Sequence, residues 1–220
     1  MEERITAAAQ RAGRERSQVT LVAVSKKFSA AVMREGYQLG LREFGENYVQ
    51  EFARKSADLQ DLSEARFHMI GHLQTNKAAI AASHFQVVQT VDSPKLLERL
   101  DRALAEAGHS MDVLIEVKLS NEASKTGAGP EAIPELLEAG GRLNHVHIAG
   151  LMTIPPWSRN QEESRPYFRR LADLAARYSL PQISMGMSND FEAAIEEGAT
   201  IVRVGTAIFG ARPKPAGEGQ

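Results

Sequence analysis

The 220-residue chain contains no cysteine and one tryptophan, and aromatic residues make up 6% of it. Without cysteine there can be no disulfide, no thiolate metal ligand and no cysteine nucleophile, which leaves His, Asp, Glu, Lys and Ser for chemistry. A chain of this kind suits a reducing compartment, so we expect a cytoplasmic protein.

Neither sign of charge dominates the chain, and long apolar runs are missing. It holds 26 Lys and Arg against 28 Asp and Glu, a formal net charge of -2. Binding that depends on neutralising many phosphates is therefore not expected, which argues against nucleic acid and membrane partners. The longest apolar runs, such as residues 20–24, have strand length and fall short of the roughly 20 residues of a membrane span. The N-terminus also lacks the apolar stretch of a secretory signal.

Short apolar runs alternate with helix-period segments along the chain. A helical stretch over residues 2–14 comes first, and Ser93-Pro94 and Gly108 later mark a typical helix start and end. Strands that alternate with helices and are apolar on both faces predict a parallel sheet covered by helices. The runs occur at residues 21–24, 42–44, 67–70, 85–91, 113–117, 146–151, 182–185 and 201–204.

Eight strand-and-helix units in a chain of this length match the lower end of the size range of a closed (β/α)8 barrel. The alternative is a doubly wound open sheet, which has a Gly-rich turn after its first strand. The segment here, residues 25–29, contains no glycine. We therefore predict an α/β fold, a single (β/α)8 TIM barrel with an extra N-terminal helix, over residues 1–211. Residues 212–220 are predicted to be a flexible C-terminal tail.

Two loops at the carboxyl ends of the predicted strands each combine a glycine with a hydroxyl residue just before a helical segment. Residues 184–190 follow the seventh strand and contain a glycine, and Ser188 or Asn189 can cap the next helix. Gly205-Thr206 follows the eighth strand. In a (β/α)8 barrel the loops after strands seven and eight form the usual phosphate site. Either loop alone could consist of ordinary turn and cap residues. The occurrence of both loops after neighbouring strands predicts a phosphate site.

Lys26 follows the first strand, which barrel closure puts beside the eighth. Partial burial of an amine favours its uncharged, nucleophilic form. A nucleophilic amine beside a phosphate site suits an imine with a phosphorylated aldehyde, such as pyridoxal phosphate or a sugar phosphate. Lys27 competes for this role, and an ordinary surface lysine is the other interpretation of Lys26.

Arg203 interrupts the apolar eighth strand and has the same parity as Gly205. Its guanidinium either reaches outward between helices or points at a ligand. An arginine at the pyridine nitrogen is one known way to tune pyridoxal phosphate.

Six segments follow one another in order over nearly the whole chain. They are VSK (24–26), FGENYVQE (44–51), HMIGHLQTNK (68–77), GLM (150–152), SMGMS (184–188) and VRVGTAIFG (202–210). Together they resemble the successive motifs of the pyridoxal-phosphate homeostasis protein family. The resemblance implies a barrel like the N-terminal domain of alanine racemase, and pyridoxal 5'-phosphate as the cofactor. Two departures are visible: Phe67 stands where the family commonly has Trp, and Lys27 adds a second lysine after Lys26.

The same resemblance implies the residues that bind the cofactor. Lys26 would hold it as a Schiff base, and Arg203 would face the ring nitrogen. Asn47 and Met152 would line the ring. The phosphate would be held by Ser188, Gly205 and Thr206.

The expected function follows from what a racemase requires. A racemase needs acid and base groups on both faces of the substrate carbon, and the racemase relatives supply one from a second domain. The eighth strand is complete by Val204, which leaves no length for that domain. We therefore expect a monomeric protein, not an enzyme, that serves intracellular cofactor homeostasis, with pyridoxal-phosphate-dependent apo-enzymes as candidate recipients. The alternative is a small racemase or lyase of the alanine racemase barrel type.

Overall fold

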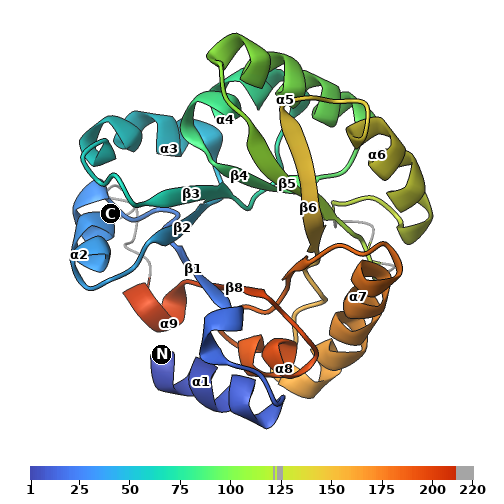
Figure 1. The fold of residues 1–220 in the computed structure, drawn as a ribbon. Helices are drawn as coiled ribbons and strands as arrows, with labels where there is room; N and C mark the ends of the chain where they lie inside the picture. The colour runs from blue at the N-terminus through green and yellow to red at the C-terminus, as the bar shows by residue number, and fades with distance from the viewer. Residues whose placement is uncertain (121, 123–125, 212–220) are drawn as a thin grey trace, which may run out of the picture.

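Eight parallel strands form a closed barrel surrounded by helices in the computed structural model, which describes residues 1–120, 122 and 126–211 (Figure 1). Each strand pairs with the next along the chain, and β8 pairs with β1, where Val22 lies opposite Arg203. The strands are β1 (Thr20–Val24), β2 (Glu43–Glu46), β3 (Arg66–Met69), β4 (Val87–Val91), β5 (Met111–Glu116), β6 (Val146–Met152), β7 (Gln182–Ser184) and β8 (Ile201–Val204).

The helices form the outer ring, and α1 lies beside α8 on the outside of the barrel (Figure 1). The α-helices are α1 (Glu2–Arg11), α2 (Ala30–Gln38), α3 (Val49–Lys55), α4 (Ala78–His84), α5 (Pro94–Ala107), α6 (Ile133–Gly140), α7 (Arg165–Arg177), α8 (Phe191–Glu196) and α9 (Thr206–Phe209). The short 3-10 helices are η1 (Arg16–Gln18), η2 (Ser56–Leu59), η3 (Thr75–Lys77), η4 (Pro130–Ala132) and η5 (Gln161–Ser164).

The predicted TIM barrel with an extra N-terminal helix is confirmed. Each of the eight apolar runs contains or overlaps a strand, and the first helix ends at Arg11, three residues earlier than expected. Helix α5 has Ser93 as its N-cap and Pro94 in its first turn, and it ends at Gly108 in the left-handed conformation with φ 76°. The predicted tail over residues 212–220 lies outside the described residues, so its flexibility and the boundary at residue 211 stay predictions.

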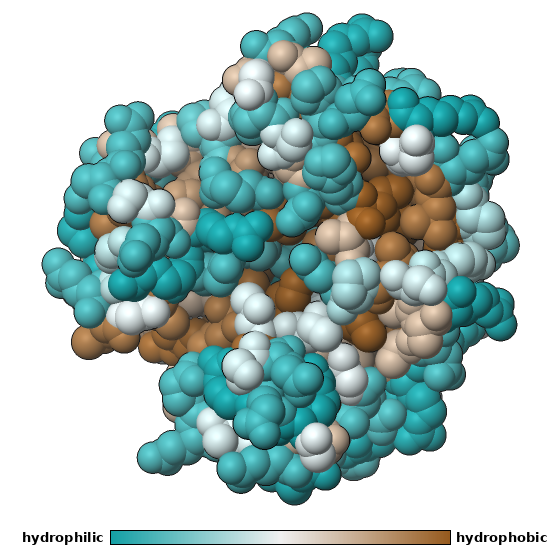
Figure 2. Space-filling model, in the orientation of Figure 1, coloured by the Kyte–Doolittle hydropathy of each residue, from teal (hydrophilic) through white to brown (hydrophobic). Residues whose placement is uncertain are grey.

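The core has two layers. The larger layer lies between the strands and the helices, and the smaller one fills the inside of the barrel. Apolar side chains therefore appear between the helices, while hydrophilic residues cover most of the outer ring (Figure 2). Within the described part of the chain, no helix is both long and apolar enough to cross a membrane. The inner layer consists of Val22, Val87, Leu114, Met152 and Ile201.

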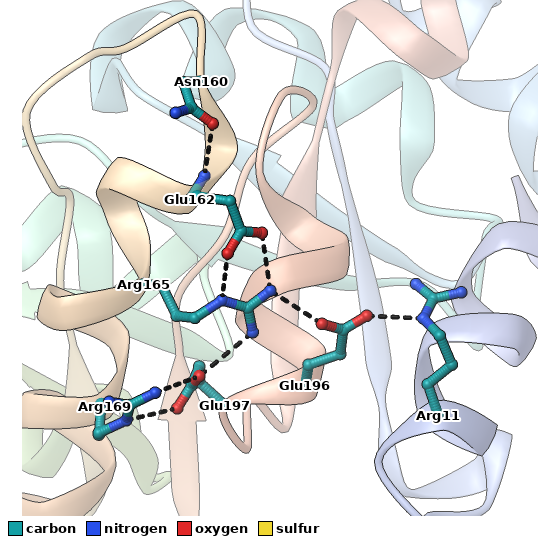
Figure 3. Close-up of polar contacts among 7 residues, drawn as sticks. All are labelled: Arg11, Asn160, Glu162, Arg165, Arg169, Glu196 and Glu197. Atoms are coloured by element: carbon teal, nitrogen blue, oxygen red, sulfur yellow. Dashed lines mark hydrogen bonds and ion pairs between the residues drawn. The ribbon is translucent and has the colours of Figure 1, made fainter.

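Charged side chains join α1, η5, α7 and α8 on the outside of the barrel (Figure 3). Arg165 contacts three carboxylates, those of Glu162, Glu196 and Glu197, at 2.8–3.2 Å. Arg11 of α1 contacts Glu196 at 2.7 Å. This network ties the N-terminal helix to the last helical units of the barrel.

Candidate functional site

A pocket of about 270 Å³ opens at the carboxyl ends of β1, β7 and β8. Five of the seven predicted site residues line it, namely Lys26, Ser188, Arg203, Gly205 and Thr206. The other lining residues are Val24, Phe28, Pro156, Trp157, Ser158, Met187, Asn189, Asp190 and Gly210. The structure therefore brings the predicted amine, arginine and two glycine-containing loops around one space.

Lys26 lies in a tight turn two residues beyond the end of β1. The backbone N–H of Phe28 donates to the carbonyl of Ser25 at 3.0 Å and closes this turn. Lys27 has φ 66°, an unusual conformation for a residue with a side chain. Lys27 is exposed, and among the described residues it does not belong to the pocket lining. The turn thus distinguishes the two lysines that the sequence left in competition.

An ion pair between Lys55 and the fully buried Glu46 supports this turn. The Nζ atom of Lys55 lies 2.7 Å from Oε1 of Glu46 and donates to the carbonyls of Ser25 and Phe28 at 3.3 and 3.0 Å. Ser25 Oγ also donates to Glu46 at 2.6 Å. Burial raises the pKa of Glu46, although the Lys55 charge and the hydrogen bonds act to lower it. Lys26 is therefore held by a turn whose carbonyls are bonded to a neighbouring helix.

The loops after β7 and β8 meet at the pocket. The N–H of Gly205 points to Ser188 Oγ at 3.3 Å. A Cβ added at Gly205 would lie 3.2 Å from the carbonyl oxygen of Val24, so a glycine keeps this wall open. The resulting surface offers two hydroxyls, those of Ser188 and Thr206, beside a close-lying backbone.

The predicted helix cap after β7 is wrong. Asp190, and neither Ser188 nor Asn189, is the N-cap of α8. Its Oδ1 accepts from the N–H of Met187 at 2.7 Å, and its Oδ2 accepts from Ser164 Oγ at 2.8 Å. Asp190 shapes the loop, which leaves Ser188 on the pocket side.

Arg203 is almost fully buried, and its side chain points into the barrel and lines the pocket. It donates to Ser184 Oγ at 2.5 Å and to the carbonyl oxygen of Thr153 at 2.9 Å. Burial lowers the pKa of Arg203 to about 10, while the carboxylates of Asp190 and Glu116 oppose this shift. The guanidinium remains cationic at neutral pH, and the hydrogen bonds to Ser184 and Thr153 fix its orientation.

Two predicted site residues are not among the described residues that line this pocket. Met152 is fully buried in the inner apolar layer. Asn47 follows β2, and its Oδ1 is buried without a hydrogen-bond partner among the described residues. Neither belongs to the described lining of the pocket. Their place at a cofactor ring stays a prediction.

Several side chains around the site were not predicted from the sequence. Lys55, Thr153 and Ser184 contact the turn or the arginine, but none stood out in the chain. Ser184 carries the clearest missed signal, because a hydroxyl in a buried strand needs a hydrogen-bond partner.

Comparison with known proteins agrees with this arrangement. Residues 1–213 match the family model described as alanine racemase, N-terminal domain, so the closed barrel is of the alanine racemase type. Two curated relatives carry the name pyridoxal phosphate homeostasis protein. The one from Aquifex aeolicus is 44% identical over 96% of this chain and 94% of the relative, and the one from Pseudomonas aeruginosa is 46% identical over 95% and 91%. The chain belongs to the pyridoxal phosphate homeostasis protein family.

Solved structures agree with both the fold and the family. PipY of Synechococcus elongatus, solved with pyridoxal phosphate bound, is 41% identical with a TM-score of 0.83, covering 95% of this chain and 99% of PipY. Alanine racemase of Corynebacterium glutamicum is 19% identical with a TM-score of 0.67, covering 98% of this chain and 62% of the racemase. The racemase likeness concerns the fold alone.

Proposed function

We propose that this protein binds pyridoxal 5'-phosphate in the pocket at β1, β7 and β8 and serves the homeostasis of that cofactor, without substantial turnover of amino acids. The observation that carries the proposal is the joint lining of one pocket by Lys26, Arg203 and the two loops. The names of the relatives and the cofactor bound to PipY support the same function.

The residues of the pocket fit the chemistry of this cofactor. Pyridoxal phosphate supplies an aldehyde, which condenses reversibly with a primary amine and releases one water, and a phosphate group. Lys26 provides the amine at one wall of the pocket. Ser188 and Thr206 provide hydroxyl donors, and the missing side chain of Gly205 lets the phosphate approach the backbone. A pocket with an amine and hydroxyl donors suits a phosphorylated aldehyde.

Arg203 supports a role in storage and release over one in catalysis. A guanidinium donates hydrogen bonds and accepts none, so at the ring nitrogen it favours the unprotonated pyridine. By keeping the pyridine unprotonated, Arg203 would make the ring a weaker electron acceptor. Arg203 would therefore orient the ring while limiting the chemistry that amino-acid enzymes obtain from it.

The described lining also supports slow turnover. Racemisation needs a second acid or base opposite the lysine. Tyr48, the tyrosine next to the end of β2, is 52% exposed and does not belong to the described lining. Asp190 lines the pocket, but both of its carboxylate oxygens accept hydrogen bonds from the protein. We propose that release to pyridoxal-phosphate-dependent apo-enzymes, and not conversion of amino acids, is the function of this site.

A covalent label tests the proposal. The protein is mixed with pyridoxal phosphate, its spectrum is recorded between 300 and 500 nm on the order of seconds after mixing, and borohydride then fixes the adduct for peptide mass mapping. We expect a visible absorbance band and a label on Lys26. Lys26→Ala removes both, whereas Lys27→Asn, which tolerates the left-handed turn position, keeps them. A label on Lys27 in the unaltered protein contradicts the assignment.

A second measurement separates carrier from enzyme. The loaded protein is incubated with each amino acid in deuterated water, and exchange of the α-proton is followed by NMR. We expect negligible exchange. Rapid exchange with turnover would instead identify a small racemase or lyase.

A further inference from the structure

A chain of hydrogen bonds crosses the inside of the barrel from Arg203 to the opposite mouth. Arg203 donates to Ser184 Oγ at 2.5 Å, and Ser184 Oγ lies 2.6 Å from Gln89 Oε1. Gln89 Nε2 lies 2.9 Å from His68 Nδ1, and His68 Nε2 lies 2.5 Å from Glu43 Oε2. Five strands, β8, β7, β4, β3 and β2, each contribute one link.

The middle of this chain is buried. Ser184 and Gln89 are 0% exposed, and His68 is 3% exposed. Buried polar groups without partners are costly, so a fully paired chain is the arrangement that this interior tolerates. The proposed cofactor function assigns no role to Gln89, His68 or Glu43.

The far end of the chain opens into a second pocket of about 170 Å³. Glu43, His68 and Arg66 line it together with residues at the starts of β1, β7 and β8. Arg66 lies 3.8 Å from Glu43 and 3.9 Å from Asp112, so three charged side chains cluster at the end of the chain where His68 contacts Glu43. The hydrogen bond from His68 and the nearby Arg66 keep the pKa of Glu43 below its ordinary value, although burial alone raises it. An ionised carboxylate therefore ends the chain.

The two ends decide the direction of every bond between them. Arg203 can only donate, so Ser184 accepts from it and gives its own proton to Gln89 Oε1. Gln89 then donates through Nε2, and His68 Nδ1 has to accept. His68 carries its proton on Nε2 and donates it to Glu43, which as a carboxylate only accepts. The contacts thus specify one neutral tautomer of His68.

The chain has one reversed alternative. If His68 also carried a proton on Nδ1, the Gln89 amide would have to turn over and donate to Ser184. Ser184 would then face two donors, Arg203 and Gln89, and its own proton would lose its acceptor in a buried site. The placement of protons on the His68 ring therefore decides whether the Ser184 hydroxyl, which accepts from Arg203, keeps an acceptor for its own proton.

We infer that Ser184, Gln89 and His68 are positioning residues that hold the Arg203 guanidinium toward the cofactor pocket. We also infer that the placement of protons on the His68 ring, at the opposite mouth, is coupled to cofactor binding. This inference rests on the proposed function. Coupling of this kind is reciprocal, so a ligand that engages Arg203 also alters the surroundings of His68.

The first test needs no cofactor and measures the unaltered protein, with one variant used only to assign the signal. NMR of the protein labelled with 15N-histidine reports which ring nitrogen of His68 carries the proton. The signal is assigned by its loss in His68→Asn. We expect the Nε2–H tautomer at neutral pH. An Nδ1–H tautomer contradicts the direction of the chain and overturns the inference.

The second test follows the coupling from end to end. Addition of pyridoxal phosphate is expected to shift the His68 ring signals in the unaltered protein and in Gln38→Leu, a surface control on α2. The shift is expected to vanish in Gln89→Leu. Ser184→Ala is expected to weaken cofactor affinity about tenfold, the effect of one lost charged hydrogen bond, and Ser184→Thr to restore part of it.

The outcomes distinguish the two proposals. Absence of a Lys26 adduct in the unaltered protein contradicts the proposed function. An adduct that forms normally, together with unaltered affinity and spectrum in both Ser184→Ala and Gln89→Leu, contradicts the positioning chain alone. If either variant fails to fold, the tautomer measurement on the unaltered protein still decides the inference.

Discussion

Lys55 Nζ lies 2.7 Å from Glu46 Oε1, directly under the turn that carries Lys26. Glu46 is fully buried and Lys55 mostly so, and Lys55 also contacts Glu51 at 3.2 Å. Glu51 in turn accepts from the backbone N–H of Lys27 at 2.6 Å. The position of the candidate nucleophile therefore depends on α3 as much as on β1.

Replacement of Lys55 by methionine is expected to destabilise the protein by roughly 3–5 kcal/mol, because it leaves the Glu46 carboxylate buried without its counter-charge. Urea unfolding measures the loss. Lys95→Met, on an exposed position of α5, is the matched control and should change stability by less than about 0.5 kcal/mol. Adding Glu46→Gln to Lys55→Met should recover part of the stability. No recovery would show that lost packing, and not the unpaired charge, dominates.

The contrast between Lys26 and Lys55 illustrates what the sequence can predict. Lys26 was identifiable because strand order and barrel closure alone put the end of the first strand beside the last two loops. Lys55 lies in a helix 29 residues later, and its reach beneath the turn depends on the packing of α3 against the barrel. Such a contact leaves no local pattern in the chain.

The interior chain was only partly predictable for a related reason. Arg203 stood out as a charge within an apolar strand. Gln89 and Ser184 also interrupt apolar runs, at the parity that faces the barrel interior, so their inward direction could have been inferred. The hydrogen bond between Gln89 and Ser184 could not have been inferred, because β4 and β7 are not neighbouring strands. The distance between two such side chains depends on the radius of the barrel.

Glu116 is expected to make stability fall as the pH rises. Burial raises the pKa of this carboxyl, and the hydrogen bond from Thr126 at 2.9 Å offsets only part of the effect. The contribution of the protonated Glu116 carboxyl to the free energy of unfolding is fully present below the ordinary Glu pKa of about 4.3. It is lost as the pH rises through the higher pKa of the folded state.

Glu116→Gln tests this pH dependence, because its amide oxygen can still accept from Thr126. The variant should gain stability relative to the unaltered protein at neutral pH, and the gain should shrink toward pH 4. Urea unfolding at several pH values measures the difference. A gain that is equal at all pH values would contradict a contribution from ionisation. Glu98→Gln, on an exposed position of α5, is the control.

The network around Arg165 is expected to have the opposite pH dependence. The arginines keep the pKa values of Glu162, Glu196 and Glu197 below the ordinary value, although burial opposes this shift. Their stabilisation is present above the ordinary Glu pKa and is lost as the pH falls through the lower pKa values of the folded state.

Arg165→Gln should cost roughly 1–2 kcal/mol at pH 7 for a network of partly exposed pairs and should flatten the loss of stability below about pH 4.5. Thermal unfolding at pH 3 to 7 measures both effects. Because the pairs are near the surface, 1 M salt should reduce the difference between the two proteins. Arg170→Gln, exposed on the same helix, should leave the pH profile unaltered.

Gly205→Ala is expected to reduce both cofactor affinity and stability. The added Cβ would lie 3.2 Å from the carbonyl oxygen of Val24, which pushes the β8 loop toward the pocket where the phosphate is proposed to bind. We expect at least roughly tenfold weaker binding of pyridoxal phosphate and a stability cost of about 1–2 kcal/mol for overpacking. Gly141→Ala is the control, because Gly141 has φ -64° and its Cβ would approach no closer than 3.4 Å. Titration followed by absorbance, with urea unfolding of both variants, separates the two effects. Equal affinity in Gly205→Ala and the unaltered protein would mean that the phosphate lies away from this wall, and the Ser188 side of the pocket would then have to hold it.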